Sequence, residues 1–152
     1  MSFDIAAHLQ QTYSHVPEKP YTLKLYEFIY VSSLAAATPF TAVPQIVSRS
    51  RQYNKANDIT GMLMFDGQRF AELLEGPSDV LFEVIERIRL DPRHTNIEVL
   101  HHASVEERRF VRFSMGYVPV ELEDALSGLE KSEGPAAVQG FLDLIPVVDL
   151  DS

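Results

Sequence analysis

The sequence predicts an α+β fold in which two helices cover one face of a five-stranded, mainly antiparallel sheet. Two observations support this prediction. Short segments with alternating apolar residues, which are typical of half-buried strands, are separated by two longer segments with helical periodicity. An Asp66–Gly67 dipeptide between two of the strand segments indicates a hairpin turn. The resulting order of elements is β-α-β-β-α-β-β.

The first elements precede the hairpin. Residues 3–14 have the apolar spacing of a short amphipathic helix ahead of the sheet. The first strand is expected at residues 23–32, where aromatic and aliphatic side chains alternate. The first helix is expected at residues 41–54, with Thr41 as its N-cap and Pro44 in its first turn, where proline is tolerated.

The remaining elements complete the sheet and its second helix. They are expected at residues 59–65, 69–74, 78–90, 97–103 and 110–118. This order matches the ferredoxin-like plan, in which the first and third strands are central neighbours. Tyr30 on the first strand would then lie close to Glu72 on the third.

The chain divides into three parts around this sheet. Residues 24–118 form the predicted domain, preceded by an N-terminal extension at residues 1–23. A C-terminal tail at residues 119–152 contains two weaker helical stretches, at residues 121–129 and 135–144. The whole chain of 152 residues is long enough for one hydrophobic core. We expect no second catalytic domain.

The composition excludes several classes of protein. Without cysteine, the chain has no disulfide, no thiolate metal site and no cysteine nucleophile. Its net charge of −9 repels phosphate backbones, which argues against direct nucleic-acid binding. No apolar run approaches the roughly 20 residues that cross a bilayer, and the N-terminus lacks a signal-peptide pattern. We therefore expect a cytoplasmic protein without a membrane partner.

Glu72 is the polar residue that fits a plain core least. Because side chains alternate along a strand, Glu72 shares one face with Phe70 and Leu74. A carboxylate between two large apolar side chains is either an exposed edge residue or a buried group with a chemical role.

Other polar residues have structural as well as functional interpretations. Ser50 and Asn54 are four residues apart on the inner stripe of the first helix, so an amide points inward, although Asn is also common as a C-cap. Arg87 and Asp91 have the same spacing, which an exposed ion pair would explain. His94 is more simply a structural histidine, and the histidines lack the spacing of a zinc site.

Three stretches carry a family resemblance. They are Ser-Arg-Gln-Tyr-Asn through Ile-Thr-Gly-Met-Leu at residues 50–63, Gly67 through Leu-Glu-Gly at residue 76, and Asp-Pro-Arg-His at residues 91–94. Tyr30 precedes Asn54 by 24 residues, and Glu72 follows it by 18. In these motifs and this spacing, the chain from about residue 25 to residue 117 resembles the BLUF family of flavin-binding blue-light sensors.

The resemblance implies a flavin bound non-covalently between the two helices, over the sheet. FAD is the expected flavin, with FMN and riboflavin as alternatives. Tyr30 matches the tyrosine that supplies an electron and a proton to the excited flavin, and we place it in a photochemical relay with Glu72 and Met115. Met115 is expected on a last strand beside Tyr30 and Glu72, so that the signal passes through this strand to the tail.

The resemblance also implies a set of cofactor-binding residues. Asn54 matches the amide at the polar edge of the ring, and Arg87 and Asp91 match residues at a ring carbonyl and the ribityl chain. Arg93 and His94 match residues near the phosphate-bearing tail. The full predicted set is Ile46, Ser50, Tyr53, Asn54, Phe70, Arg87, Ile88, Asp91, Arg93 and His94.

The chain departs from the family pattern at three positions. Glu72 replaces a glutamine that lies between the tyrosine and the flavin, Phe113 replaces a frequent tryptophan, and Tyr53 replaces a frequent polar residue. A buried Glu72 should have a raised pKa and be a neutral acid, because only the protonated form has a hydrogen to donate to the flavin. We expect an altered photocycle. An amide gains a second, distinguishable hydrogen-bonding arrangement by rotating or tautomerising, and a carboxylic acid lacks it.

Three functions are consistent with these residues, and the third has the least support. The first is a light sensor, not an enzyme, that signals to an unknown downstream protein and forms a homo-oligomer. The alternative is a degenerate interaction module with the same fold and no productive photochemistry, which Glu72 supports. A flavin-dependent or hydrolytic enzyme is the third, and it lacks a second reactant site in the sequence.

Overall fold

The computed structural model describes residues 24–111, 115–120 and 126–145. Its strands are β1 (Leu25–Leu34), β2 (Thr60–Phe65), β3 (Arg69–Pro77), β4 (His94–Ser104) and β5 (Gly116–Pro119). Its helices are α2 (Val43–Ala56), α3 (Ser78–Leu90) and α4 (Pro135–Leu144), together with the short 3-10 turns η1 (Phe40–Ala42) and η2 (Leu129–Lys131).

The strands form one sheet in the order β4-β1-β3-β2-β5. All neighbouring pairs are antiparallel except β2 and β5, which are parallel. Strands β1 and β3 are therefore central neighbours, and Tyr30 is directly paired with Glu72 across them. The predicted α+β, ferredoxin-like fold is confirmed.

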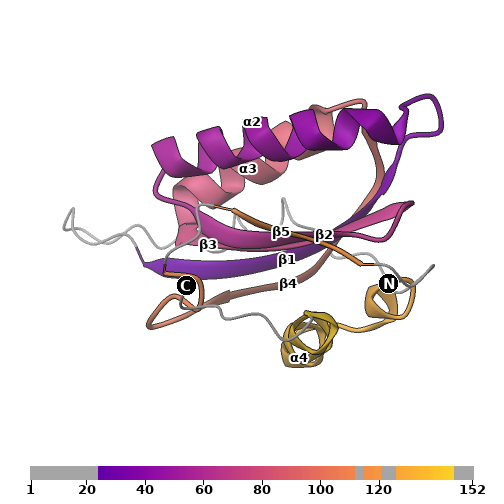
Figure 1. The fold of residues 1–152 in the computed structure, drawn as a ribbon. Helices are drawn as coiled ribbons and strands as arrows, with labels where there is room; N and C mark the ends of the chain where they lie inside the picture. Colours follow the sequence, from indigo (N-terminus) through magenta and orange to yellow (C-terminus); the bar gives the residue numbers. More distant parts are fainter. Residues whose placement is uncertain (1–23, 112–114, 121–125, 146–152) are drawn as a thin grey trace.

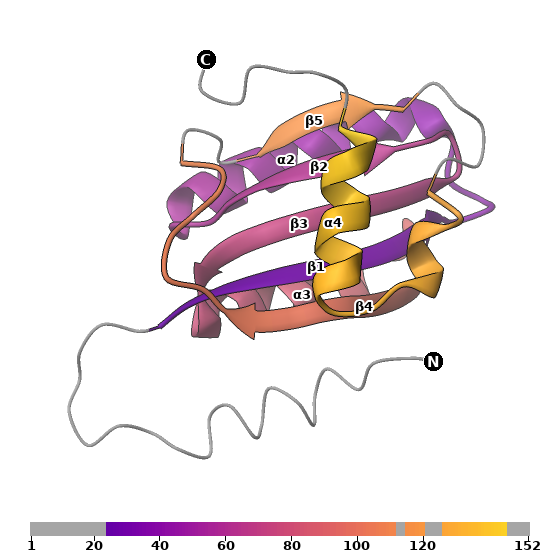
Figure 2. The same cartoon turned by 90° about the horizontal axis from the view of Figure 1, so that it is seen from below.

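Helices cover both faces of this sheet (Figure 1). Helices α2 and α3 lie side by side on one face, as predicted, and α4 crosses the strands on the opposite face (Figure 2). The face under α4 has its own core, which includes Ile29 and Leu73 from the strands, Phe110 from the connection after β4, and Phe141 from α4. The tail helix predicted at residues 135–144 therefore completes the second layer of the core.

The hairpin between β2 and β3 forms as the Asp66–Gly67 dipeptide predicts. The Asp66 carboxylate accepts backbone N–H bonds from Gln68 at 3.0 Å and from Arg69 at 2.8 Å. Gly67 has a φ of 101°, a conformation that favours glycine because it has no Cβ. This turn sets the register that places Glu72 opposite Leu63 of β2.

The last strand differs from its predicted position. β5 begins at Gly116 instead of residue 110 and pairs with β2, because β4 already occupies the edge beside β1. Strand β2 separates β5 from Glu72, and both β2 and β3 separate it from Tyr30, so the expected position of Met115 beside them is wrong. Met115 is buried under α2, where its carbonyl accepts a 3.0 Å hydrogen bond from Arg51 Nε.

The first helix also differs at both ends. A 3-10 turn contains Thr41, and α2 begins after it at Val43, so Thr41 is not the N-cap. Pro44 is in the first turn, as predicted. Helix α2 continues past Asn54, and Asn57 is its C-cap, so the C-cap interpretation of Asn54 is wrong. The helix predicted at residues 3–14 and most of the stretch at 121–129 lie outside the described residues.

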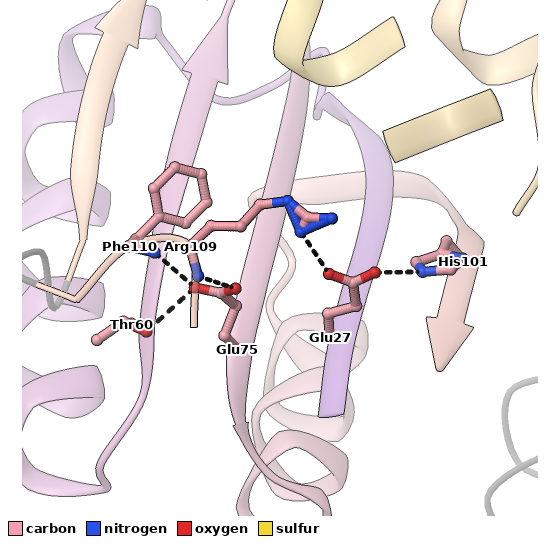
Figure 3. Close-up of polar contacts among 6 residues, drawn as sticks. All are labelled: Glu27, Thr60, Glu75, His101, Arg109 and Phe110. Atoms are coloured by element: carbon pink, nitrogen blue, oxygen red, sulfur yellow. Dashed lines mark hydrogen bonds and ion pairs between the residues drawn. The ribbon is translucent and has the colours of Figure 1, made fainter. Parts of the chain in front are cut away.

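A buried polar network lies on the α4 face of the sheet (Figure 3). The Glu75 carboxylate accepts backbone N–H bonds from Arg109 at 2.7 Å and from Phe110 at 2.9 Å. The Glu27 carboxylate contacts Arg109 Nη1 at 3.0 Å and His101 Nε2 at 2.8 Å. The two acids therefore fasten the connection after β4 to the central strands.

Candidate functional site

A cavity of about 150 Å³ lies between α2 and α3, above strands β1 and β3. Two of the predicted site residues, Phe70 and Met115, are not in its lining. Those that do line it are Tyr30, Ile46, Ser50, Tyr53, Asn54, Glu72, Arg87, Ile88, Asp91, Arg93 and His94. The fold therefore brings most of the predicted set, which the sequence spreads over 65 positions from Tyr30 to His94, to one cavity.

Tyr30 and Glu72 form a hydrogen-bonded pair at the floor of the cavity. The Tyr30 hydroxyl donates to Glu72 Oε1 at 2.5 Å, a short distance for an O–H···O bond. Both side chains are almost fully enclosed, with 2% and 4% of their surface exposed. Glu72 is therefore a buried group and not an exposed edge residue, which were the two interpretations of the sequence.

Burial controls the ionisation of this pair. It raises the pKa of Glu72 to about 7, although the hydrogen bond from Tyr30 acts in the opposite direction. Burial and the negative charge of Glu72 also raise the pKa of Tyr30 well above its ordinary value. The predicted upward shift of Glu72 is confirmed. Because its pKa is near 7, the neutral and ionised forms are both populated at neutral pH.

The α2 wall presents an amide and an aromatic ring. Asn54 is 3% exposed in the last turn of α2, and Ile46, two turns earlier, is equally buried. On the α3 wall, the Arg87 guanidinium carbon lies 4.1 Å from the centroid of the Tyr53 ring. This cation–π contact links the two helices across the cavity. The inward position of the amide follows from helical periodicity, as the sequence predicts.

The segment that follows α3 contains a compact ion pair. Arg93 Nη2 and Nε donate to the Asp91 carboxylate at 2.7 and 3.1 Å, and Nε is also 2.9 Å from the second oxygen. This interaction lowers the pKa of Asp91 and raises that of Arg93. Asp91 therefore pairs with Arg93 and not with Arg87, contrary to the simple i, i+4 interpretation.

His94 lines the cavity and packs against Phe70, which lies outside the lining. His94 Nδ1 is 3.2 Å from the Ser32 hydroxyl, and burial lowers the pKa of the imidazole. The Phe70 ring packs against His94, with centroids 4.9 Å apart, and also against Phe65. Phe70 supports the cavity from behind, because it belongs to the core beneath α2.

Sequence reasoning missed three residues that line the cavity: Arg49, Leu63 and Val84. Each had a signal in the sequence. Arg49 is one turn after Ile46 and one turn before Tyr53, which are both predicted site residues. Leu63 pairs with Glu72 across the hairpin, and Val84 precedes Ile88 by one turn of α3.

The residues present fit a flavin. An amide, a guanidinium and the Tyr30–Glu72 pair supply donors and acceptors along one side, and Ile46, Ile88 and other aliphatic groups supply apolar walls. The cavity is smaller than the roughly 300–1,000 Å³ of typical ligand sites. A flat tricyclic ring would therefore require side chains of the lining to move apart.

A cavity between two helices with a polar edge and apolar walls has the composition of a small-molecule or cofactor site. The chain belongs to the BLUF family, described as sensors of blue-light using FAD, and the match covers residues 25–116. This finding confirms the family predicted from the sequence. FAD is accordingly the cofactor of the family to which this domain belongs.

Relatives of known structure and function carry the same domain. The structure resembles BlrB, a BLUF protein in its dark state, with a TM-score of 0.70, 30% identity and coverage of 82% of this chain and 96% of that one. The blue light- and temperature-regulated antirepressor BluF of Escherichia coli is 33% identical over 63% of this chain. Photoactivated adenylate cyclase subunit beta of Euglena longa is 30% identical over 68%. The matches cover only 24% and 13% of these two longer relatives.

The described residues contain neither a membrane-spanning helix nor a cluster of metal ligands. No helix there is long and apolar enough to cross a membrane. The same part of the chain contains no group of three or more His, Asp or Glu side chains that is arranged to hold a metal ion.

Proposed function

We propose that this protein is a blue-light photoreceptor that binds FAD non-covalently between α2 and α3 and signals through protein contacts, without enzymatic activity of its own. The observation that carries the proposal is the buried Tyr30–Glu72 hydrogen bond at the floor of the cavity. Buried polar pairs that face a cavity are candidates for chemical roles, because structure alone rarely requires them there. Family membership supports the choice of ligand.

The walls of the cavity would hold the ring. Asn54 offers a carbonyl acceptor and an NH₂ donor to the polar edge of the ring, and Arg87 offers N–H donors to a carbonyl. Ile46 and Ile88 would lie against the two ring faces, while Asp91 would lie near the ribityl chain. Leaving any of these polar groups without its partner in a closed site is costly, which gives the site its preference for one ring orientation.

Tyr30 would be the photochemical donor. A bound FAD would supply the light-driven electron-accepting chemistry, and the Tyr30 hydroxyl would provide the electron and the proton. The Tyr30 proton already points at Glu72 Oε1, so Glu72 is the group that receives or passes on that proton. Burial excludes water from this transfer.

Glu72 would set the properties of the photocycle. In its neutral form, the acid can donate one hydrogen to the flavin and accept another from Tyr30, as a glutamine does. In its ionised form it can only accept, and it then faces flavin acceptors without a hydrogen to offer. Exchange of its proton between two equivalent oxygens regenerates the same acid, so we expect no long-lived rearranged state.

A degenerate interaction module is the second candidate, and the replacement of the family's glutamine by Glu72 favours it. An ionised carboxylate at this position would face the flavin acceptors without a hydrogen to offer. The test is the visible spectrum of the purified protein after reconstitution with FAD, before and after blue illumination. A yellow protein with a light-induced spectral change supports the photoreceptor, and a colourless protein supports the module.

The output would pass to a separate protein or domain. The antirepressor and the cyclase subunit are each much longer than the matched region, so their BLUF domains occur together with other sequence. We propose an unidentified downstream protein as the partner, contacted through β5 and the tail after it, and self-association of the domain. Hydrogen exchange of β5 and α4 in light and darkness tests this route, and identical protection in a photoactive protein would exclude it.

A further inference from the structure

The cavity is lined by three arginines although the chain is acidic overall. Arg49, Arg87 and Arg93 line it, whereas its carboxylates are Asp91 and the partly neutral Glu72. The net charge of the whole chain is −9, with 13 Lys and Arg against 22 Asp and Glu. An arginine in this lining whose charge no carboxylate compensates would favour an anionic group on the ligand.

Two of the basic groups near the proposed phosphate tail are unsuited to hold it. The Arg93 guanidinium donates through both Nε and Nη2 to Asp91, so its charge is already compensated. His94 is buried beside Ser32, and burial disfavours its cationic form. Neither residue brings an uncompensated positive charge to the cavity.

Arg87 is also occupied. Its guanidinium packs on the Tyr53 ring and spans the space between the two helices. It is therefore placed to meet the ring of a flavin that enters between the helices, and not a group at the end of the flavin chain.

Arg49 is the remaining cation. Its side chain is exposed on α2 and reaches the cavity lining. Among the residues that the structure describes, Arg49 has no ion pair, hydrogen bond or ring contact. An arginine fork binds phosphate oxygens through two parallel N–H bonds, which gives both strength and orientation.

We propose that Arg49 binds the phosphate of the flavin chain and makes this site selective for phosphorylated flavins, FMN or FAD, over riboflavin. The inference rests on the proposed flavin site and adds the residue that chooses among flavins. It transfers the phosphate contact from the Arg93–His94 segment, which the family resemblance suggested, to α2.

The test is a fluorescence titration of riboflavin, FMN and FAD against the unmodified protein and Arg49→Gln. We expect the unmodified protein to bind FMN and FAD about tenfold more tightly than riboflavin, as one charge-assisted pair allows. Arg49→Gln should abolish this preference and leave the riboflavin affinity unchanged. Added salt should weaken FMN binding in the unmodified protein more than in the variant.

Arg89→Gln is the control variant, and Arg93→Gln tests the competing phosphate contact. Arg89 is exposed on α3 and paired with Glu86 outside the cavity, so its removal makes the same charge change and should keep the preference. Equal affinity of the unmodified protein for all three flavins overturns the inference, as does an equal loss for all three in Arg49→Gln. Loss of the preference in Arg93→Gln alone also overturns it. Failure to bind any of the three flavins overturns the proposed function itself.

Discussion

Glu27 and Glu75 face each other directly across strands β1 and β3, on the sheet face opposite the Tyr30–Glu72 pair. Like charges in this position repel, and both side chains are buried. The repulsion is offset by Arg109, by His101 and by two backbone N–H groups (Figure 3). The same two strands thus carry one acidic pair that fastens the fold and one acid–tyrosine pair that faces the cavity.

The first prediction concerns the stability contributed by Glu75. Glu75→Ala leaves the buried N–H of Phe110 and the N–H of Arg109 without their acceptor, so the free energy of unfolding should fall by about 2–4 kcal/mol. Urea denaturation measures this change. As a control, Glu86→Ala removes an exposed acid paired with Arg89 and should cost less than about 1 kcal/mol. Equal costs for the two variants would contradict the role of the network.

The second prediction is that Glu72 makes the fold less stable as the pH rises. Its pKa rises from an ordinary 4.5 to about 7 on folding, so the folded chain binds more protons than the unfolded chain between these values. The contribution of Glu72 is complete below pH 4.5 and is lost as the pH rises through 7, by about 3 kcal/mol.

Glu72→Gln isolates this contribution from other titrating groups. The variant lacks the titration, so its stability relative to the unmodified chain should increase from pH 5 to pH 8. Denaturation of both proteins at several pH values tests the sign. A difference that does not change with pH, or that changes in the opposite direction, would exclude a raised pKa for Glu72.

The third prediction concerns the photocycle. In the flavin-loaded protein, blue light should produce no long-lived red-shifted spectrum, because a neutral acid has no distinct second arrangement. Glu72→Gln supplies an amide in the same position and should produce or lengthen the red shift. Absorption spectra recorded during and after illumination measure the lifetime. A slowly reverting red shift in the unmodified chain would refute this account of Glu72.

The fourth prediction concerns the amide on α2. Asn54→Ala should weaken flavin binding by about 1–3 kcal/mol, or roughly 5- to 150-fold, because the polar edge of the ring loses its partner. Asn57→Ala is a matched control, since Asn57 caps α2 through the Tyr53 carbonyl and lies outside the cavity lining. Titration with FAD should distinguish the two variants, and similar losses would mean that Asn54 acts only through helix stability.

Local patterns in the sequence predicted elements that depend on nearby residues. Helix α3 begins and ends where its apolar period of 3.6 indicates, at Ser78 and Leu90. The Asp66–Gly67 turn determined the hairpin register, and that register determined the face on which Glu72 lies. Helical spacing likewise directed Ile46 and Asn54 inward.

Contacts between residues far apart in the sequence could not be predicted from local patterns, and the tertiary structure decides them. Strand β5 takes the free edge beside β2, because β4 already covers β1, and this choice moves Met115 away from Tyr30. Asp91 has candidate partners at both Arg87 and Arg93, and only the conformation of the segment after α3 selects Arg93. Spacing defines which residues share a face of one element, whereas packing between elements decides which of those faces meet.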